Sequence, residues 1–426
     1  MKIAIIGGGA AGMMAAATIN ENNPKAEVFL IEKNASLGKK VIISGGGRCN
    51  VTTGLQDVQA ILGKYPRGGK FLNSAIRQFS PQNTRDWFEN HGVPLKCEND
   101  MRVFPISNNG KDVVKAFEKV FKKYKTNILF NHQVTKVKRL HKSAGFIINF
   151  KTQKALQVDK VILTLGGQAY RQTGSTGDGY SLAENLGHHI TELAPSLSSL
   201  ISKEKWPTLI AGLSFSKATF SAKTKSPTGR VNKYSFTGPF VFTHWGISGP
   251  AVFALSSLIA FETFSPNQQL KITIDLLPDL KIEKIITDLK KFIKNNPNKL
   301  FKHTLQQFIP LSMATVVIEQ VKIDIAPSTS LRAGKKNNAI SNKELNQTAN
   351  WLKNIPLTIT DRKAGDEFVT AGGVDLAEVN PSTMESKICP NLYFAGEILN
   401  IDGFTGGFNL QASWATGHLA GLNSCK

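Results

Sequence analysis

MKIAIIGGGAAG, residues 1–12, is the stretch that decides the fold of this chain. Residues 2–6 are apolar and rich in isoleucine, which is typical of a buried parallel strand. Gly7, Gly9 and Gly12 follow in a G-x-G-x-x-G spacing, and the residues after them predict a helix. The first glycine permits a tight turn, the second lets the backbone approach a pyrophosphate, and the third allows close helix packing. The start of that helix would offer free N–H groups and a positive dipole to phosphates.

A second strand and an acid complete the pattern. Residues 28–31 predict the strand, and Glu32 follows it, twenty residues after Gly12. An acid at this distance accepts hydrogen bonds from an adenosine ribose, and it favours a free 2′-hydroxyl over a 2′-phosphate. FAD or NAD(H) is therefore expected rather than NADP(H). A glycine turn without a ligand is the alternative, and the ordered strand, glycines, helix, strand and acid argue against it.

Composition limits the partners. The chain has 426 residues and a net charge of +21, with 52 Lys and Arg against 31 Asp and Glu. Its lysines are scattered, which favours a solvated surface over a nucleic-acid stripe, although RNA or an anionic substrate stays open. The densest groups lie at residues 281–302 and 335–343, where aromatic residues for base stacking are few.

Several classes of protein are disfavoured. The four cysteines form no C-x-x-C pair, so neither a zinc site nor a redox disulfide is expected, and no other metal site is indicated. The most apolar stretch, residues 251–261, is too short to span a bilayer and predicts a core helix. The start of the chain does not resemble a signal peptide, so a cytoplasmic location is expected. The oligomeric state stays open.

Patterning along the chain predicts a discontinuous α/β domain. Strand and glycine character occupies residues 1–195 and returns at 357–426. Between them, residues 196–269 alternate like an antiparallel sheet or small barrel, and residues 270–356 look mostly helical. Residues 36–55 are expected to be a glycine-rich loop.

Two further segments carry chemistry. Three glycines precede Arg48 in ISGGGRCN, residues 43–50, and can expose backbone N–H groups to an anion. Cys49 within that loop is expected to be a packing residue rather than a reactive thiol. The segment NLYFAGE, residues 391–397, predicts a strand that ends at an acid, and a helix is expected to start near Asn409. The N-terminus of such a helix could stabilise negative charge on a flavin.

Taken together, these motifs resemble one family. GGGAAG, SGGGRCN, GSTGDGY, FTHWGISGP, TAGGV and LYFAGEILNIDGFTGGFNLQ span nearly the whole chain. The combination is similar to the BaiN/YhiN-like family of FAD-binding oxidoreductases, which is related more distantly to the fumarate reductase and succinate dehydrogenase flavoproteins. The resemblance implies a two-dinucleotide-type, Rossmann-like FAD domain with inserted antiparallel β-barrel-like and helical subdomains.

The resemblance also implies which residues bind FAD. The glycine turn would hold the pyrophosphate, Glu32 the adenosine ribose, and the backbone of Val134 the adenine. The segment 162–165 departs from the family, because Leu165 occupies a place where a smaller residue is usual. The implied positions are Gly7, Gly9, Ala11, Gly12, Glu32, Lys33, Lys40, Gly47, Arg48, Asn50, Val134, Gly166, Gly167, Gly396, Glu397, Asn409, Leu410 and Gln411.

The expected activity is FAD-dependent hydride transfer to or from a small organic substrate held between the FAD domain and the insertion, and an anionic substrate is one alternative. No second G-x-G-x-x-G follows a strand, so NAD(P)H would dock transiently, or oxygen would accept the electrons. His244 and Arg48 are candidate catalytic residues, whereas His188 and His189 are expected at a helix end or in solvent. An RNA-modifying flavoprotein and a non-catalytic flavin-binding protein stay open as alternatives.

Overall fold

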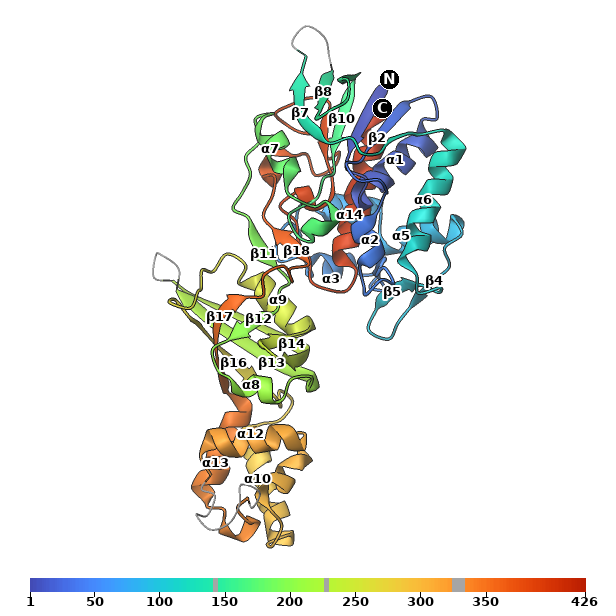
Figure 1. Ribbon diagram of the computed structural model, residues 1–426. Helices are drawn as coiled ribbons and strands as arrows, with labels where there is room; N and C mark the ends of the chain where they lie inside the picture. Colours follow the sequence, from blue (N-terminus) through green and yellow to red (C-terminus); the bar gives the residue numbers. More distant parts are fainter. Residues whose placement is uncertain (141–144, 226–229, 324–333) are drawn as a thin grey trace. The chain divides into compact units, whose positions relative to one another are not determined.

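The computed structural model describes residues 1–140, 145–225, 230–323 and 334–426. The chain divides into two compact units (Figure 1). The first contains Met1–Ser196 and Gly365–Lys426, and the second contains Leu197–Ala364. No helix in the described ranges is both long and apolar enough to cross a membrane.

A five-stranded parallel sheet forms the centre of the first unit, in the order β19-β10-β1-β2-β6. Its central strands are apolar and buried, as parallel strands covered on both faces must be. Because all five strands are parallel, their carboxyl ends meet at one edge, where ligands of such sheets bind. The strands are β1 (Lys2–Ile6), β2 (Glu27–Ile31), β6 (Asn127–Leu129), β10 (Lys160–Leu163) and β19 (Leu392–Phe394).

Two helices from opposite ends of the chain pack against each other beside this sheet. They are α1 (Ala10–Asn22) and α14 (Phe408–Ser424), and Figure 1 shows the two termini side by side. Glycines allow the close approach, because a Cβ on Gly417 would lie 2.4 Å from the Ala11 carbonyl oxygen. The two ends of the sequence are thus joined through backbone contact.

The rest of the first unit surrounds this centre. Helix α5 begins at Pro81, and the Ser80 hydroxyl caps it. One expectation was wrong, because residues 36–55 contain a helix. Residues 70–125 are largely helical and also contain two short strands that pair with each other. The elements are α2 (Lys39–Ile43), β3 (Thr52–Thr53), α3 (Val58–Leu62), α4 (Asn73–Gln78), α5 (Pro81–Asn90), β4 (Leu95–Cys97), β5 (Arg102–Pro105), α6 (Gly110–Tyr124), β7 (Val134–Arg139), β8 (Phe146–Phe150), β9 (Leu156–Val158), α7 (Asp178–Glu184), β11 (Ala194–Ser196) and β18 (Val369–Ala371).

The second unit contains a closed antiparallel barrel, in the order β12-β15-β14-β13-β16-β17. Its apolar residues face inward and share one core with α9, the helix expected at residues 251–261. The elements are β12 (Leu200–Ser202), α8 (Trp206–Leu209), β13 (Ser214–Lys225), β14 (Val231–Thr243), β15 (Gly246–Ser248), α9 (Pro250–Leu258), β16 (Leu270–Asp275), α10 (Ile282–Asn295), α11 (Phe301–Thr304), α12 (Leu311–Val321), α13 (Asn342–Lys353) and β17 (Ile355–Arg362).

The expected boundaries inside the insertion need correction. Strand β16 lies within the range 270–356 that looked helical, and β17 crosses the boundary at 356/357. Both strands belong to the barrel, because β16 pairs with β13 and β17 pairs with β12. The alternation of buried and exposed residues in β16 extends over only six residues, too few to stand out beside the lysine-rich helix that follows.

His188 also differs from expectation. Its side chain is fully buried, with Nδ1 3.1 Å from Glu378 Oε2 and Nε2 2.9 Å from Ser386 Oγ. The residue therefore joins the helix end after α7 to a segment almost two hundred positions later. Burial lowers the pKa of His188, although the Glu378 carboxylate opposes this shift.

We expect His188→Gln to destabilise the protein by about 1–2 kcal/mol at pH 7.5, because buried hydrogen-bond partners lose their match. In the wild type the folded-state pKa lies below the unfolded value of about 6.5, so this stabilisation is present above pH 6.5 and declines as pH falls. Urea unfolding from pH 5 to 8 measures both effects. His189→Gln, at the exposed neighbouring position, is the control, and equal loss in both variants would contradict the assignment.

We expect Gly417→Ala to destabilise the protein by about 1–3 kcal/mol, because the added methyl group would meet backbone rather than a movable side chain. Thermal unfolding measures the loss. Gly63→Ala is the matched control, since Gly63 has an ordinary φ of −65° and its nearest neighbour would be 3.4 Å away. A Gly417→Ala protein as stable as Gly63→Ala would show that the two helices can separate without loss.

Candidate cofactor site

The three glycines after β1 have different reasons to be glycine. Gly7 has a φ of +111°, and a Cβ there would lie 2.7 Å from the Thr164 carbonyl oxygen. A Cβ on Gly12 would lie 1.9 Å from the Gly7 carbonyl oxygen. A Cβ on Gly9, in contrast, would meet nothing within 4 Å. The protein itself requires the first and third glycines, so the open space at the second is available to a ligand.

The start of α1 faces that space. Gly9 is the N-cap residue and provides no side-chain cap, and the first intrahelical bond runs from the Met13 N–H to the Gly9 carbonyl. The preceding N–H groups therefore have no partner within the helix. Together with the helix dipole they form a site suited to a phosphate group.

Glu32 lies beside the glycine turn and is buried. Its Oε2 accepts a hydrogen bond from the Gly8 N–H at 2.8 Å, and its Oε1 accepts one from the Asn34 N–H at 2.8 Å. The Asn34 side-chain amide donates a second hydrogen bond to Oε1 at 2.7 Å. These contacts fix the carboxylate, and Oε2 keeps capacity for another hydrogen bond, such as one from a ribose hydroxyl. Lys33 is held elsewhere, with Nζ 2.6 Å from Asp178 Oδ2.

Segments from four parts of the chain meet at Glu397. Its Oε2 lies 2.7 Å from Lys40 Nζ, and its Oε1 accepts a hydrogen bond from the Thr370 N–H at 2.9 Å. A Cβ on Gly167 would lie 2.4 Å from Thr370 Oγ1 and 3.0 Å from Glu397 Oε1. The sequence predicted Lys40, Gly167 and Glu397 as site residues, and the structure brings them together.

The Tyr180 hydroxyl is a further candidate contact for a ligand. It is buried, and no hydrogen bond from it meets ordinary distance and angle limits among the described residues. Burial raises the pKa of this hydroxyl and the negative charge of Glu397 raises it further, whereas the Thr370 side chain lowers it. Gly166 is in the left-handed region with a φ of +73°, and a Cβ on Gly396 would lie 2.8 Å from the Ala11 Cβ. A buried orphan hydroxyl in such surroundings is suited to a polar cofactor atom.

The start of α14 supplies a second set of free N–H groups. Gly407 is its N-cap residue, with a φ of +89°, and again provides no side-chain cap. The Asn409 side chain is used to hold the preceding turn, because it exchanges two hydrogen bonds with the backbone of Gly403. The backbone N–H groups of Asn409 and Leu410 therefore remain available to an acceptor.

Gln411 has a structural role in this helix. Its side chain is completely buried, donates to the Phe79 carbonyl at 2.8 Å, and accepts from the hydroxyls of Thr52 and Thr84. Three of its hydrogen-bonding positions are thus used inside the protein. A contact between Gln411 and the cofactor stays a prediction.

The glycines in the loop at residues 44–50 have the backbone conformation expected of an anion-binding loop. The Arg48 side chain, however, already has a carboxylate partner. Gly45, Gly46 and Gly47 all have positive φ, and a Cβ on either of the last two would meet nothing within 4 Å. Arg48 donates to Glu98 at 2.7 Å and lies over the Phe104 ring at 3.8 Å, so its charge is already compensated.

The neighbours of Arg48 are structural. Burial raises the pKa of the Cys49 thiol to about 12, which keeps it protonated at neutral pH and agrees with a packing role. The Asn50 Oδ1 accepts from the Val103 N–H at 3.3 Å. Val134 begins β7 and pairs with Phe150, and its contact with adenine stays a prediction. His244 is exposed in the turn between β14 and β15, and its catalytic role also stays a prediction.

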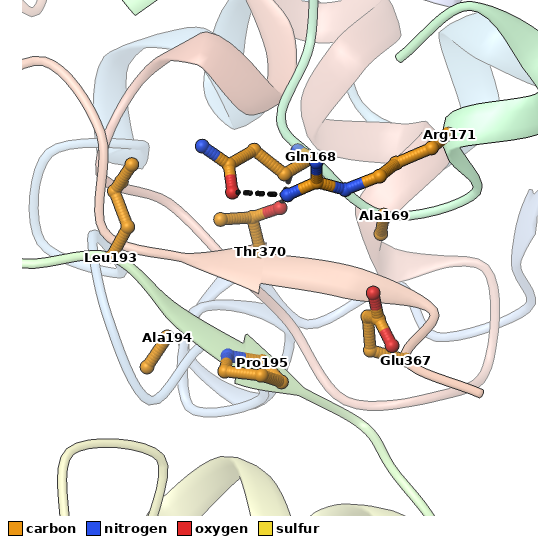
Figure 2. A pocket seen from close by; sticks show the side chains of 8 residues that line it. All are labelled: Gln168, Ala169, Arg171, Leu193, Ala194, Pro195, Glu367 and Thr370. Carbon is orange, nitrogen blue, oxygen red and sulfur yellow. Dashed lines mark hydrogen bonds between the residues drawn. The ribbon is translucent and has the colours of Figure 1, made fainter. Parts of the chain in front are cut away.

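A pocket beside these residues was missed by sequence reasoning. Figure 2 shows Leu193, Ala194 and Pro195 lining one part of it, with Gln168 and Arg171 in another. Arg171 donates to Gln168 Oε1 at 3.0 Å, and Thr370 Oγ1 accepts from the Gln168 N–H at 2.7 Å. The remaining lining residues are Ala169, Glu367 and Thr370. The sequence signal for it is weak: Gln168 directly follows the predicted Gly166-Gly167 contact, and Arg171 comes three residues after Gln168.

Comparison with known proteins identifies the family. Residues 1–423 match the family described as "HI0933-like protein Rossmann domain". The chain belongs to this family. The match agrees with the resemblance seen in the sequence motifs. The protein is therefore a flavoprotein, and its cofactor is FAD.

Relatives of the chain cover almost its whole length. It is 31% identical over 422 residues to "3-dehydro-bile acid delta(4,6)-reductase" from Clostridium scindens, covering 99% of this chain and 98% of the relative. It is 27% identical over 426 residues to "Ribosomal RNA dihydrouridine synthase" from Haemophilus influenzae, covering 98% and 97%. The E. coli quinol fumarate reductase subunit FrdA shares the fold, with 16% identity, a TM-score of 0.50, and coverage of 100% and 70%.

These matches establish the class of protein. The chain is an FAD-dependent oxidoreductase with a Rossmann-type domain and an antiparallel barrel. The geometry accommodates the cofactor: α1 and α14 present free N–H groups, Gly9 leaves open space, and the buried Tyr180 hydroxyl makes no hydrogen bond within the described residues. When bound, FAD supplies a group that accepts and delivers hydride.

We expect Gly9→Ala to lower FAD affinity at least tenfold without lowering the thermal stability of the apoprotein by more than a few degrees. The added methyl group meets no protein atom, so any large effect must come from the ligand. Flavin absorbance after titration of the apoprotein measures binding. The control is Gly63→Ala, because Gly63 has an ordinary φ of −65° that alanine can adopt. Gly46 also has open space around it, but its φ of +70° would strain an alanine. Unchanged FAD affinity in Gly9→Ala would move the pyrophosphate away from this turn.

Proposed function

We propose that this protein reduces a carbon–carbon double bond conjugated with a carbonyl group, using NAD(P)H as the source of hydride. The proposal rests on one type of reaction that is common to relatives named for different substrates. A delta(4,6)-reductase of a 3-dehydro bile acid and a dihydrouridine synthase both convert C=C into CH–CH. In uracil and in a delta-4 3-oxo compound, that double bond is conjugated with a carbonyl.

The reaction adds one hydride and one proton across the double bond. Hydride goes to the carbon remote from the carbonyl, and the proton goes to the adjacent carbon, while negative charge collects on the carbonyl oxygen. A positively charged or N–H donor at that oxygen lowers the barrier. The main catalytic contribution required of the protein is therefore a donor placed at the carbonyl oxygen.

Arg171 is our candidate for this donor. It lines the pocket, and Gln168 orients its guanidinium through the 3.0 Å hydrogen bond. Thr370 connects the pocket to the cofactor site, since its N–H donates to Glu397 and its hydroxyl accepts from Gln168. Leu193, with Ala194 and Pro195, provides an apolar wall suited to a hydrocarbon body. Glu367 also lines the pocket, so its carboxylate opposes a second anionic group there. A small enone with a hydrocarbon body fits these features best.

A second candidate substrate is uridine within ribosomal RNA. The relatives named as rRNA dihydrouridine synthases favour it, as does the net charge of +21. The conversion at the double bond would be the same, so the two candidates differ in how the substrate is held rather than in the chemistry.

We expect the purified holoprotein to be reduced by NADPH or NADH without oxygen, and then to be reoxidised by a 3-oxo-delta-4 steroid acid or by uridine-containing rRNA. Stopped-flow absorbance of the flavin band follows both half-reactions, and mass spectrometry identifies a product heavier by two hydrogens. A flavin that only oxygen reoxidises would contradict the proposal.

Arg171→Ala tests the pocket separately. We expect the reoxidation rate by the substrate to fall on the order of 100-fold, as for removal of a donor to a developing oxyanion, with reduction by NAD(P)H unchanged. Arg77→Ala on α4 is the control, because that exposed side chain donates a hydrogen bond to Asn73, one turn earlier on the same helix. An Arg171→Ala protein with full activity would place the substrate elsewhere.

A further inference from the structure

The positive charge is unevenly divided between the two units. Residues 197–364 contain 23 Lys and Arg against 10 Asp and Glu, a net charge of +13. The other 258 residues contain 29 against 21, a net charge of +8. The smaller unit therefore carries most of the excess, and it is the unit outside the Rossmann-type domain.

Within the insertion, the range around one hairpin contains positively charged residues and no negatively charged ones. Residues 205–261 contain six Lys and Arg and no Asp or Glu, and this range includes the long paired strands β13 and β14. The lysine-rich helix α10 is different, because acids are interspersed in its own sequence and Lys284 pairs with Asp288 at 2.7 Å. On the hairpin, Lys217 of β13 pairs with Asp279, which lies after β16. The hairpin is thus a better candidate for an anion-binding surface than the densest lysine cluster in the sequence.

The strand register aligns three lysines across the barrel. Lys223 on β13 is directly opposite Lys233 on β14. On the other side of β13, Ala222 pairs with Ile272, so the next register position places Lys271 beside Lys223. All three side chains are exposed, and no ion pair involving them is found within the described ranges. Like charges directly opposite each other destabilise a sheet, so this lysine row (Lys223, Lys233 and Lys271) is unexplained by folding.

Hydroxyl groups continue the same face. Thr219 and Thr237 pair opposite each other, with their hydroxyls 2.7 Å apart, and Ser221 and Ser235 pair next to them at 3.3 Å. The opposite side of these strands carries buried residues, such as Phe220 and Ile272. The face is therefore polar, cationic and free of aromatic side chains at the positions that alternate with the core.

Acidic groups near the lysine row are already engaged. Asp275, at the far end of β16, lies 2.6 Å from Lys353 Nζ. Glu262 accepts hydrogen bonds from the hydroxyls of Thr224 and Tyr234, which alternate with the lysine positions along the hairpin. Neither carboxylate is paired with the lysine row.

We propose that the outer face of β14, β13 and β16 binds the sugar–phosphate backbone of RNA through the lysine row. This inference rests on the RNA-directed form of the proposed function. Adjacent strands lie about 4.8 Å apart, so the row spans about 10 Å and its flexible side chains can reach successive phosphates. Lysine and hydroxyl side chains are typical phosphate contacts. Because aromatic platforms are missing from this face, it would hold the backbone and leave base recognition to the reductase site.

The test uses the full-length holoprotein and a fluorescein-labelled, single-stranded 30-nucleotide RNA rich in uridine. The triple variant Lys223→Gln, Lys233→Gln, Lys271→Gln is compared with wild type by fluorescence anisotropy between 50 and 200 mM KCl. We expect at least tenfold weaker binding at 100 mM and a salt slope reduced by about 2, since three phosphate contacts contribute about 0.7 each. The triple Lys→Arg variant, which keeps the charge, should bind like wild type.

The control variant removes the same charge elsewhere. Lys119→Gln, Lys122→Gln, Lys123→Gln changes exposed residues of α6 in the first unit, and it should change affinity less than threefold. Equal losses in both glutamine variants, or no loss in the first, would overturn the docking surface. So would a first variant that keeps RNA binding but loses binding to vesicles of 30% anionic phosphatidylglycerol, because a lipid surface would then explain the row.

Failure of the docking surface and failure of the proposed function give different results. All variants should keep wild-type rates of flavin reduction by NAD(P)H, because the lysine row lies outside the cofactor site. If wild type binds no RNA, the RNA-directed function and the docking surface both fail, while reduction of a small enone stands. If wild type binds RNA and the glutamine variant binds equally well, only the docking surface fails.

Discussion

Backbone contact between α1 and α14 is the constraint on which the cofactor site depends. Gly417 and Gly421 bring the last helix within contact of the Ala11 and Ala15 carbonyls on the first helix. Both helix N-termini are thereby fixed relative to the same sheet. A bulkier interface would move the two helix N-termini apart, so the small residues here determine how the two dipoles are placed as well as how the helices pack.

The site is built from segments that are remote in sequence and adjacent at the ends of parallel strands. Lys40 follows the second strand, Gly167 follows β10, and Glu397 follows β19. No one segment forms a binding surface by itself. The ion pair between Lys40 and Glu397 keeps two of them together and would orient the carboxylate before any cofactor arrives.

Local sequence signals predicted much of the fold and of the candidate site. The features that were not predicted depend on contacts between residues far apart in the sequence. The first glycines, Glu32 and the short parallel strands could be recognised because each motif acts within about thirty residues. The partners of His188 lie almost two hundred residues away, and the closure of the barrel by β16 and β17 depends on pairing that no single segment reveals. The pocket was missed for the same reason, since Arg171 and Thr370 have no common motif.

The two-stranded sheet of β11 and β18 has a consequence for how this chain could have arisen. The polypeptide leaves the first unit just after Ser196 and re-enters it before Val369, and these two strands pair with each other. Exit and entry are therefore neighbours, so the segment between them can be exchanged without breaking the parallel sheet. Evolution could alter the recruited partner while the redox chemistry is inherited unchanged.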